Sequence, residues 1–237
     1  MEILEQVQGK RTKITVSKEG DRLFLKFGDG TEIQSMVDLK NPLLPPLTDH
    51  YWNYIALFPL INPDLKSILI LGFGAGTIPR LLNFYYPTLE IDSVEIDQEV
   101  IDIVKRHFPI GKMNIIHDDA THYLRVSPKS YDLIVLDAFE EGDFDESLLT
   151  DEFFHALKSR LKGGGIVVGN YIYRQDIAQK YKYFFVKYFK SRFRLQMPRS
   201  YNYLVWGSDM EYSAKDLPDG GELAPLVEIM RNQTKVL

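Results

Sequence analysis

The chain has 237 residues, of which 45% are hydrophobic and 13% aromatic, with a formal net charge of −5 and no cysteine. This length and apolar content suffice for one α/β domain with a small appendage, and the lack of cysteine excludes disulfides, thiolate metal sites and cysteine nucleophiles within these residues. The negative charge disfavours a nucleic-acid surface and suits a cationic small substrate.

The first six residues, M-E-I-L-E-Q, are acidic and lack the apolar run of a signal peptide. No stretch of the sequence has the apolar length that a membrane span needs. Together with the absence of cysteine, these features predict a cytoplasmic protein that has neither a membrane nor a nucleic acid as its partner.

Short strands separated by glycine turns are expected in the N-terminal segment. The turns are K-E-G and G-D-G, and the second predicts a tight hairpin. The expected strands are Thr12–Val16, Arg22–Phe27 and Thr31–Met36. They form a β-meander that is too small to be stable alone, and we assign it to a first domain over residues 1–50. A proline-rich break follows, and a helix from His50 to Leu60 is predicted to open a second domain, residues 51–237.

Strands and helices alternate from Ser67 onward, which predicts an α/β fold with a mostly parallel sheet. The expected strands are Ile68–Leu71, Glu90–Glu95, Met113–His117, Tyr131–Leu136 and Gly165–Asn170, and an antiparallel pair, Phe193–Met197 and Tyr203–Gly207, closes a seven-stranded sheet. The expected helices are Thr77–Tyr85, Gln98–His107, Ala120–Arg125, Thr150–Leu161, Asp176–Lys190 and a short one near the C-terminus.

A glycine-rich turn follows the first of these strands. The run I-L-I-L-G-F-G-A-G-T carries Gly72, Gly74 and Gly76 between a strand and a helix. Gly72 and Gly74 permit a tight turn and a close approach of the backbone to a ligand, and the helix that begins near Thr77 directs its free N–H groups to the same place. The phosphate-loop G-K-S/T is absent. The alternative is a strand-to-helix turn that binds nothing.

Carboxylates stand at the ends of the next two strands. Glu95 follows the glycines by about 20 residues, the spacing at which a carboxylate accepts hydrogen bonds from ribose hydroxyls. The alternative for Glu95 is a solvated carboxylate. Asp97 is expected to cap the next helix. Asp118 and Asp119 follow the third strand, where a carboxylate can accept a hydrogen bond from the adenine amine or cap a helix, and both roles are compatible.

Asp137 ends the fourth strand, and no helix follows at once for it to cap. The carboxyl ends of parallel strands meet at one edge of a sheet, so Gly72, Glu95, Asp118 and Asp137 should line one crevice. Asp137 begins an acidic cluster that also contains Glu140, Glu141, Asp143 and Asp145. Such carboxylates attract a cationic amine and raise one another's pKa values, which favours a base near neutral pH.

Two further interpretations of this region are open. The acidic cluster is alternatively a solvated loop that caps the helix beginning near Thr150, and Gly142 suggests that the loop closes over an acceptor. His117 and His122 flank Asp118 and Asp119 and suggest a metal site. Because the strand-to-helix context already accounts for the carboxylates, we expect no metal.

These motifs resemble the spermidine synthase (polyamine aminopropyltransferase) family, in particular its uncharacterised spermidine-synthase-like branch. The resemblance rests on L-G-F-G-A-G-T, V-E-I-D-Q-E-V-I, D-D-A, Y-D-L-I-V-L-D-A-F, L-L-T-D-E-F-F and L-K-G-G-G-I. It implies a Rossmann-like class I methyltransferase fold behind an N-terminal β-domain, decarboxylated S-adenosylmethionine as donor, and a homodimer.

The resemblance also implies roles for single residues. Glu95 would hold the donor ribose, Asp119 its adenine, and Gln34 would lie against the donor. Asp137 and Glu140 would match the two aspartates of the family's D-S-S-D-P motif, the first of which deprotonates or orients the attacking amine.

The chain departs from the family at the acceptor side. Ala75 replaces the aspartate of the family's G-G-G-D-G, E-E-G-D-F replaces D-P-x-G-P, and His50-Tyr51-Trp52 stands where the family has Tyr-Gln-Glu in an ungapped count. These changes favour a small-molecule amine other than plain putrescine as the acceptor. A methyltransferase that uses intact S-adenosylmethionine is the alternative, because Ala75 would not repel a carboxylate on the donor tail. A catalytically silent nucleoside-binding protein is the third hypothesis.

Overall fold

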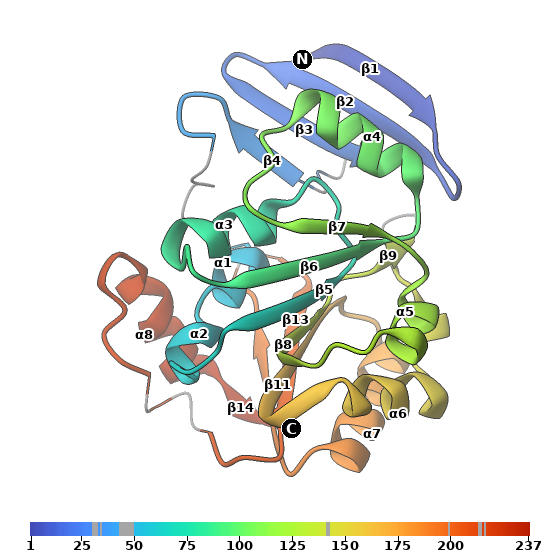
Figure 1. Ribbon diagram of the computed structural model, residues 1–237. Helices are drawn as coiled ribbons and strands as arrows, with labels where there is room; N and C mark the ends of the chain where they lie inside the picture. The colour runs from blue at the N-terminus through green and yellow to red at the C-terminus, as the bar shows by residue number, and fades with distance from the viewer. Residues whose placement is uncertain are drawn as a thin grey trace.

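The computed structural model describes residues 1–29, 33, 35–42, 50–140, 143–198, 200–212, 215 and 217–237, with the backbone alone for 139–140 and 143–144. A four-stranded antiparallel sheet lies beside a larger α/β part (Figure 1). The strands of the small sheet are β1 (Glu2–Gln8), β2 (Lys13–Glu19), β3 (Arg22–Phe27) and β4 (Ser35–Asp38).

The small sheet has one strand more than predicted. Strand β1 pairs antiparallel with β2, from Glu2 opposite Lys18 to Gln8 opposite Lys13, and it was missed because its side chains are largely exposed and carry little apolar signal. Of the predicted strand 31–36, Ser35 and Met36 lie in β4, whereas 31–32 and 34 lie outside the described residues.

The inner face of the small sheet packs on helix α4 (Gln98–His107). Its buried Ile14, Val16 and Leu25 belong to the same apolar cluster as Val100 and Val104. The small sheet therefore shares its core with the larger part, as expected for a meander that cannot bury enough apolar surface alone.

The central sheet has the order β14-β12-β13-β11-β8-β5-β6-β7. Its strands are β5 (Ser67–Leu71), β6 (Glu90–Glu95), β7 (Asn114–His117), β8 (Tyr131–Leu136), β11 (Leu161–Ile172), β12 (Ser191–Gln196), β13 (Asn202–Ser208) and β14 (Lys235–Val236). Strands β11, β8, β5, β6 and β7 run parallel, and β13, β12 and β14 are antiparallel. The predicted mostly parallel α/β sheet is confirmed, with the two-residue β14 as an eighth strand.

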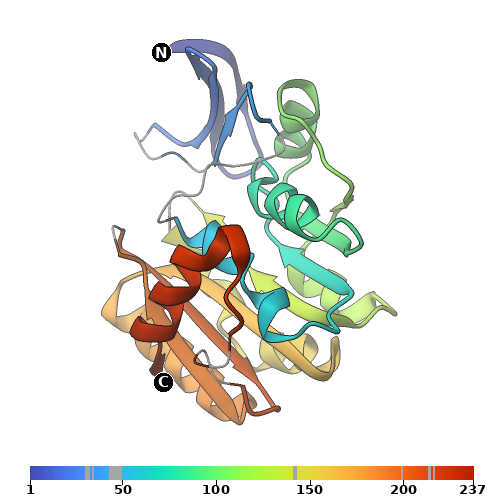
Figure 2. The same cartoon turned by 90° about the vertical axis from the view of Figure 1, so that its left-hand side faces the viewer.

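Helices cover both faces of this sheet. They are α1 (Tyr51–Ile55), α2 (Phe58–Ile61), α3 (Thr77–Tyr85), α4, α5 (Ala120–Val126), α6 (Asp151–Ser159), α7 (Gln175–Tyr188) and α8 (Ala224–Gln233). Along β5, Ile68 and Ile70 pack in one core with α1, α3 and α8, whereas Leu69 and Leu71 pack in a second core with α6 and α7. Figure 2 looks onto the face that α8, in red, covers. No helix of the described segments is long and apolar enough to cross a bilayer.

Four predicted helices differ in their bounds. Two of them differ only by one or two residues, namely α5, which ends at Val126 rather than Arg125, and α7, which spans Gln175–Tyr188 rather than Asp176–Lys190. The helix expected from His50 to Leu60 is split into α1 and α2, because Pro59 has no N–H to continue the first helix and instead occupies the first turn of the second. The helix expected to end at Leu161 ends at Ser159, and β11 begins at Leu161 with an irregularity before Ile166.

The strand order places β5 at the centre of the crevice. The chain continues from β5 to β6 and β7 on one side and then crosses to β8 on the other, which is the topological switch where ligands bind in open α/β sheets. Backbone hydrogen bonds join the strand ends, from Gly72 N to Val94 O (2.9 Å), Asp137 N to Leu71 O (2.8 Å) and Asp118 N to Glu95 O (3.1 Å).

Candidate active site

An open pocket lies beyond the carboxyl ends of β5 to β8. Gly72, Gly74, Glu95, Asp118, Asp119 and Asp137 all line it. The sequence therefore predicted correctly that these residues come together. Arg11, Thr12 and Phe27 of the small sheet line the same pocket and were not predicted. Gln34 lies outside the described residues.

The three glycines of the turn have different structural roles. Gly72 has a φ of +102°, and a Cβ there would lie 2.2 Å from the carbonyl oxygen of Asp137, so the close approach of β5 to the end of β8 requires glycine. Gly74 has a φ of +52° and nothing within 4 Å of a Cβ. Gly76 is the N-cap of α3 and is absent from the pocket lining. Gly74 thus offers open space to a ligand, whereas Gly72 serves chain packing.

Glu95 lies beneath the glycine turn and is only partly exposed. Its Oε2 accepts a hydrogen bond from the N–H of Phe73 (3.2 Å) and its Oε1 from the N–H of Asp97 (3.1 Å). Burial raises the pKa of Glu95 above its ordinary value, although these N–H groups oppose the shift. Glu95 is therefore a positioned carboxylate at the pocket wall rather than a fully solvated one.

Asp97 caps α4 as predicted, since its Oδ1 accepts a hydrogen bond from the N–H of Glu99 (3.0 Å). Its Oδ2 also accepts one from the N–H of Lys10 (2.6 Å), in the turn between β1 and β2. This contact holds that turn, and with it Arg11 and Thr12, at the edge of the pocket.

Asp118 and Asp119 combine capping with a position in the pocket wall. Asp119 is the N-cap of α5 and accepts a hydrogen bond from the N–H of His122 (2.9 Å). Asp118 contacts Nδ1 of the same histidine (2.8 Å). Among the described residues, no group of three or more histidine, aspartate or glutamate side chains is arranged to hold a metal ion.

Asp137 is held by two neutral donors from distant parts of the chain. The hydroxyl of Tyr51 donates to Oδ2 (3.0 Å) and Nδ2 of Asn170 donates to Oδ1 (2.9 Å). Burial raises the pKa of Asp137 to about 7, although both hydrogen bonds oppose the shift. A carboxylate that binds a proton near neutral pH is suited to general-base work.

Burial, rather than neighbouring carboxylates, causes the raised pKa of Asp137, so the expected physical reason was wrong. Tyr51 and Asn170 were both missed as site residues. Asn170 could have been found, because it lies near the carboxyl end of β11, which pairs with β8. Tyr51 lies in the stretch that aligns with the family's Tyr-Gln-Glu, which marked it as part of the acceptor side. That alignment did not predict its contact with Asp137.

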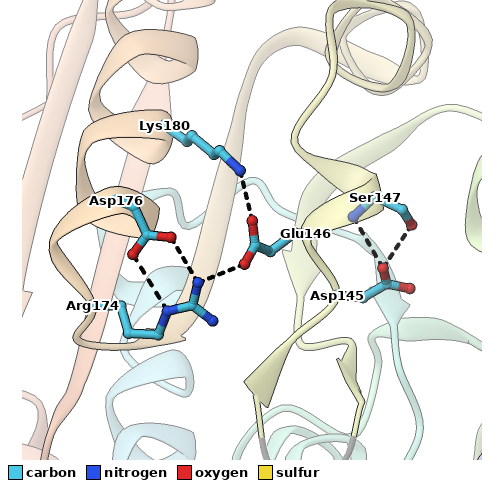
Figure 3. A network of polar contacts seen from close by, with 6 residues as sticks. All are labelled: Asp145, Glu146, Ser147, Arg174, Asp176 and Lys180. Atoms are coloured by element: carbon cyan, nitrogen blue, oxygen red, sulfur yellow. Dashed lines mark hydrogen bonds and ion pairs between the residues drawn. The ribbon is translucent and has the colours of Figure 1, made fainter.

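In the acidic segment after Asp137, the structure describes the side chains of Asp145 and Glu146, and both are paired with cations. Asp145 pairs with Arg11 (2.8 Å). Figure 3 shows Glu146, which pairs with Arg174 (2.7 Å) and Lys180 (2.6 Å). Burial raises the pKa of Asp145, but hydrogen bonds from Ser147 and Arg11 lower it by more, so the pKa lies below its ordinary value.

Hydrogen bonds from Lys180 and Arg174 also lower the pKa of Glu146. Asp145 and Glu146 therefore stay charged and fasten the segment, Asp145 to the small sheet and Glu146 to α7. The side chains of Glu140 and Asp143 and all of Glu141 and Gly142 lie outside the described residues.

A buried cation lies behind the glycine turn. Arg80 is 1% exposed and donates hydrogen bonds to the carbonyl oxygen of Ala75 and to Oγ1 of Thr77. Its Nε has no hydrogen-bond partner, and burial lowers the pKa of Arg80 to about 10, so it stays charged near neutral pH. Ala75 itself is fully buried. The turn thus has a cation behind it and no carboxylate at position 75.

The sequence profile of the "Spermine/spermidine synthase domain" family matches residues 48–212. The chain belongs to this family. A polyamine aminopropyltransferase of Clostridium beijerinckii is 29% identical over 175 residues, which are 70% of this chain and 58% of that protein. One from Chromobacterium violaceum is 31% identical over 163 residues, which are 67% of this chain and 61% of that protein. The chain therefore spans about 60% of the length of these relatives.

Solved structures of other proteins share the fold. A probable spermidine synthase from Corynebacterium glutamicum superposes with a TM-score of 0.80 at 20% identity, over 100% of this chain and 91% of that chain. A spermidine synthase in complex with the transition-state analogue AdoDATO superposes with a TM-score of 0.69 at 18% identity, over 88% of this chain and 74% of that chain. Human methyltransferase-like protein 13, in complex with SAH, superposes with a TM-score of 0.61 at 19% identity, over 77% of this chain and 90% of that chain. These likenesses confirm the methyltransferase-like fold.

Proposed function

We propose that this protein transfers an aminopropyl-type group from decarboxylated S-adenosylmethionine to an amine. The observation that carries the proposal is Asp137, a partly buried carboxylate in the pocket whose pKa is raised by burial to about 7. Membership of the spermine/spermidine synthase family supports it. The name "polyamine aminopropyltransferase", which the matched relatives carry, supplies the reaction class.

The chemistry requires little from the protein beyond position and proton removal. The amine nitrogen attacks the carbon next to the sulfonium, the N–C bond forms, and the C–S bond breaks with its electron pair going to sulfur. The product of the donor is a neutral thioether, which needs no acid to leave. The amine must lose a proton, and Asp137 is placed to accept it.

We assign the donor to the side of the pocket formed by the ends of β5, β6 and β7. The open space above Gly74 admits the ligand, Glu95 accepts hydrogen bonds from the ribose, and Asp118 and Asp119 lie where the adenine would bind. In this proposal residues 1–50 form a domain that closes the pocket over residues 51–237, and Gln34 and Glu140 keep the donor and acceptor roles predicted from the resemblance.

The acceptor side favours an amine other than plain putrescine. Asp145 and Glu146 are neutralised by Arg11, Arg174 and Lys180. Asp137, in contrast, receives only neutral donors. Of the described carboxylates after β8, Asp137 is therefore the one whose charge is available to a cationic acceptor.

A methyltransferase is the second candidate, and Ala75 with Arg80 favours it. By the resemblance, an aspartate at position 75 would face the donor tail and repel its carboxylate, although Ala75 itself is fully buried behind the pocket wall. In this chain that position is an alanine, and the guanidinium of Arg80 binds its carbonyl oxygen. The cation behind the turn would attract the carboxylate of intact S-adenosylmethionine rather than repel it.

Calorimetric binding of methylthioadenosine and S-adenosylhomocysteine tests the proposal. The two ligands share adenosine and differ in the amine and carboxylate of the tail. We expect methylthioadenosine to bind more tightly, and a tighter S-adenosylhomocysteine would replace the first proposal by the methyltransferase. If neither binds, the protein is a silent member of the family. The homodimer, the cytoplasmic location and the absence of nucleic-acid or membrane partners stay predictions.

A further inference from the structure

A chain of side-chain hydrogen bonds leads from Asp137 away from the pocket. Nδ2 of Asn170 donates to Oδ1 of Asp137 (2.9 Å), and Nδ2 of Asn202 donates to Oδ1 of Asn170 (3.0 Å). Asn170 and Asn202 lie in the paired strands β11 and β13, and Asp137 directly follows β8, which pairs with β11 on its other side. Asn170, the middle residue of this series of hydrogen bonds, is fully buried.

The backbone holds Asn202 firmly at the start of β13. Its N–H donates to Oγ of Ser200 (3.2 Å), and its carbonyl oxygen accepts a hydrogen bond from the N–H of Met197 (2.9 Å). Its partner across the sheet is Ile172. The side-chain amide of Asn202 is therefore presented to Asn170 from a fixed position.

The chain of amides has a direction. A side-chain amide has one oxygen that accepts and one nitrogen that donates. Because Asn202 donates to the oxygen of Asn170, the nitrogen of Asn170 faces Asp137 and can only donate to Oδ1. The hydroxyl of Tyr51, at Oδ2, can rotate and either donate or accept. A proton on Asp137 is therefore accommodated on Oδ2 and not on Oδ1.

We propose that Asn202 is a positioning residue for the transfer reaction, because through Asn170 it makes Oδ2 of Asp137 the oxygen that receives the proton of the attacking amine. This inference rests on the proposed function. In the step, the N–H bond of the amine breaks, an O–H bond forms at Oδ2, and the hydroxyl of Tyr51 rotates to accept a hydrogen bond from it.

Other ionisable groups face Asp137, and all of them are common to the variants compared below. Tyr51 approaches from α1, and Tyr181 of α7 lies under Asn170, with its hydroxyl 3.4 Å from the carbonyl oxygen of Asn170. Across the pocket lie the carboxylates Glu95, Asp97, Asp118, Asp119 and Asp145, the last paired with Arg11.

The isosteric variant Asn202→Asp reverses the chain of amides. An aspartate at position 202 can only accept, so Asn170 must turn its nitrogen toward it and present its oxygen to Asp137. The protonated form of Asp137 then gains a hydrogen bond and the ionised form loses one. We expect the midpoint of the Asp137 titration to rise by about one pH unit or more, a tenfold change in the ionisation constant. Asn202→Ala, which only frees Asn170 to turn, should give a smaller rise.

The titration is read directly from the carboxyl ¹³C resonance of Asp137 in the full chain labelled at aspartate. The resonance is assigned by its loss in Asp137→Asn. Asn232→Asp, at an exposed position on α8, is the control for one added negative charge, and it should leave the midpoint unchanged. Should Asn202→Asp fail to fold, Asn202→Ala carries the test.

Asn202→Asp is also made in the Asn170→Ala variant. This comparison tells whether the rise in the Asp137 midpoint is transmitted through Asn170 or comes from direct charge repulsion by the aspartate introduced at position 202. We expect Asn202→Asp to lose most of its effect on Asp137 there, since the residue that transmits it is gone. An equal rise in both backgrounds, or no rise in either single variant, would overturn the proposal.

The titration needs no substrate, so its result is independent of the proposed function. In a turnover assay the acid limb of the pH profile should shift with the NMR midpoint. If the midpoint shifts while the acid limb stays, Asp137 is not the base and the role of Asn202 in the reaction is overturned, whereas a shifted midpoint without any turnover would contradict the proposed function.

Discussion

The two sides of the pocket are built in different ways. On the donor side, backbone N–H groups hold the carboxylates, such as the N–H groups of Phe73 and Asp97 at Glu95 and the N–H of His122 at Asp119. On the acceptor side, Asp137 is held by Tyr51, 86 residues away, and by Asn170, 33 residues away. Backbone hydrogen bonds thus fix a binding surface on the donor side, whereas on the acceptor side burial raises the proton affinity of the base against the opposing hydrogen bonds of two distant side chains.

The largest expected effect separates these two sides. Asp137→Asn keeps an acceptor for Asn170 and a group that can bond to Tyr51, but it cannot take a proton. We expect turnover to fall by roughly 10²- to 10⁴-fold, as for loss of a general base, while methylthioadenosine binds within about twofold of the original affinity. Asp64→Asn, at an exposed loop position, is the control. A parallel loss of nucleoside binding would mean that the two sides are not separate.

A pair of glycine variants tests the contact between the glycine turn on the donor side and the backbone of Asp137 on the acceptor side. In Gly72→Ala the new Cβ would lie 2.2 Å from the carbonyl oxygen of Asp137, so we expect a loss of about 3 kcal/mol or more in the free energy of unfolding. Gly74→Ala has a similar left-handed backbone but open space around the Cβ, and it should cost about 1 kcal/mol. Denaturant unfolding of both variants measures the difference, and equal losses would contradict the close approach.

Burial of Asp137 should also appear as a dependence of stability on pH. The ordinary pKa of 3.8 is raised to about 7 in the folded protein, so between these values the unfolded chain has lost a proton that the folded chain keeps. The folded state is therefore favoured at low pH, and this contribution is lost as the pH rises through the window.

The variant Asp137→Asn has no such proton to lose. Relative to the original protein, it should gain stability between about pH 4 and 7, by an amount of order 2 kcal/mol after allowance for partial exposure. Denaturant unfolding across this range measures the gain, and two parallel stability curves would mean that Asp137 has an ordinary pKa.

On the donor side, Glu95→Gln should weaken nucleoside binding and leave proton transfer alone. Losing a charged acceptor costs about 1.5 to 3 kcal/mol, so we expect roughly a 10- to 100-fold weaker affinity for methylthioadenosine by calorimetry. The acid limb of turnover should stay in place at saturating donor. A shifted acid limb with unchanged affinity would assign Glu95 to the acceptor side instead.

The smallest expected effect concerns the ion pair that joins the small sheet to the acceptor side. Arg11 and Asp145 are 29% and 10% exposed, so Arg11→Gln should lower the free energy of unfolding by about 1 kcal/mol. Lys187→Gln, which removes the cation from the Lys187–Asp151 pair, whose side chains are 43% and 57% exposed, is the matched control and should have no measurable effect. Equal effects would show that the Arg11 pair contributes no more than a surface contact.

What the sequence predicted follows the same division. The parallel sheet, the turn at Gly72 and the cap at Asp97 were predicted because periodicity and capping are local properties. The break of the first helix at Pro59 could also have been predicted, since proline has no N–H. The contacts of Asp137 with Tyr51 and Asn170 could not, because they arise only when α1 and β11 are packed beside β8.

The pH dependence of kcat/KM, measured with decarboxylated S-adenosylmethionine and a panel of amines, tests most directly whether Asp137 is the base of the acceptor side. Since Asp137 must be ionised to take the proton, kcat/KM should rise with pH through an acid limb near the pKa of about 7, and the limb should vanish in Asp137→Asn. An acid limb in the range of an ordinary carboxylate, or one that persists in Asp137→Asn, would contradict the account.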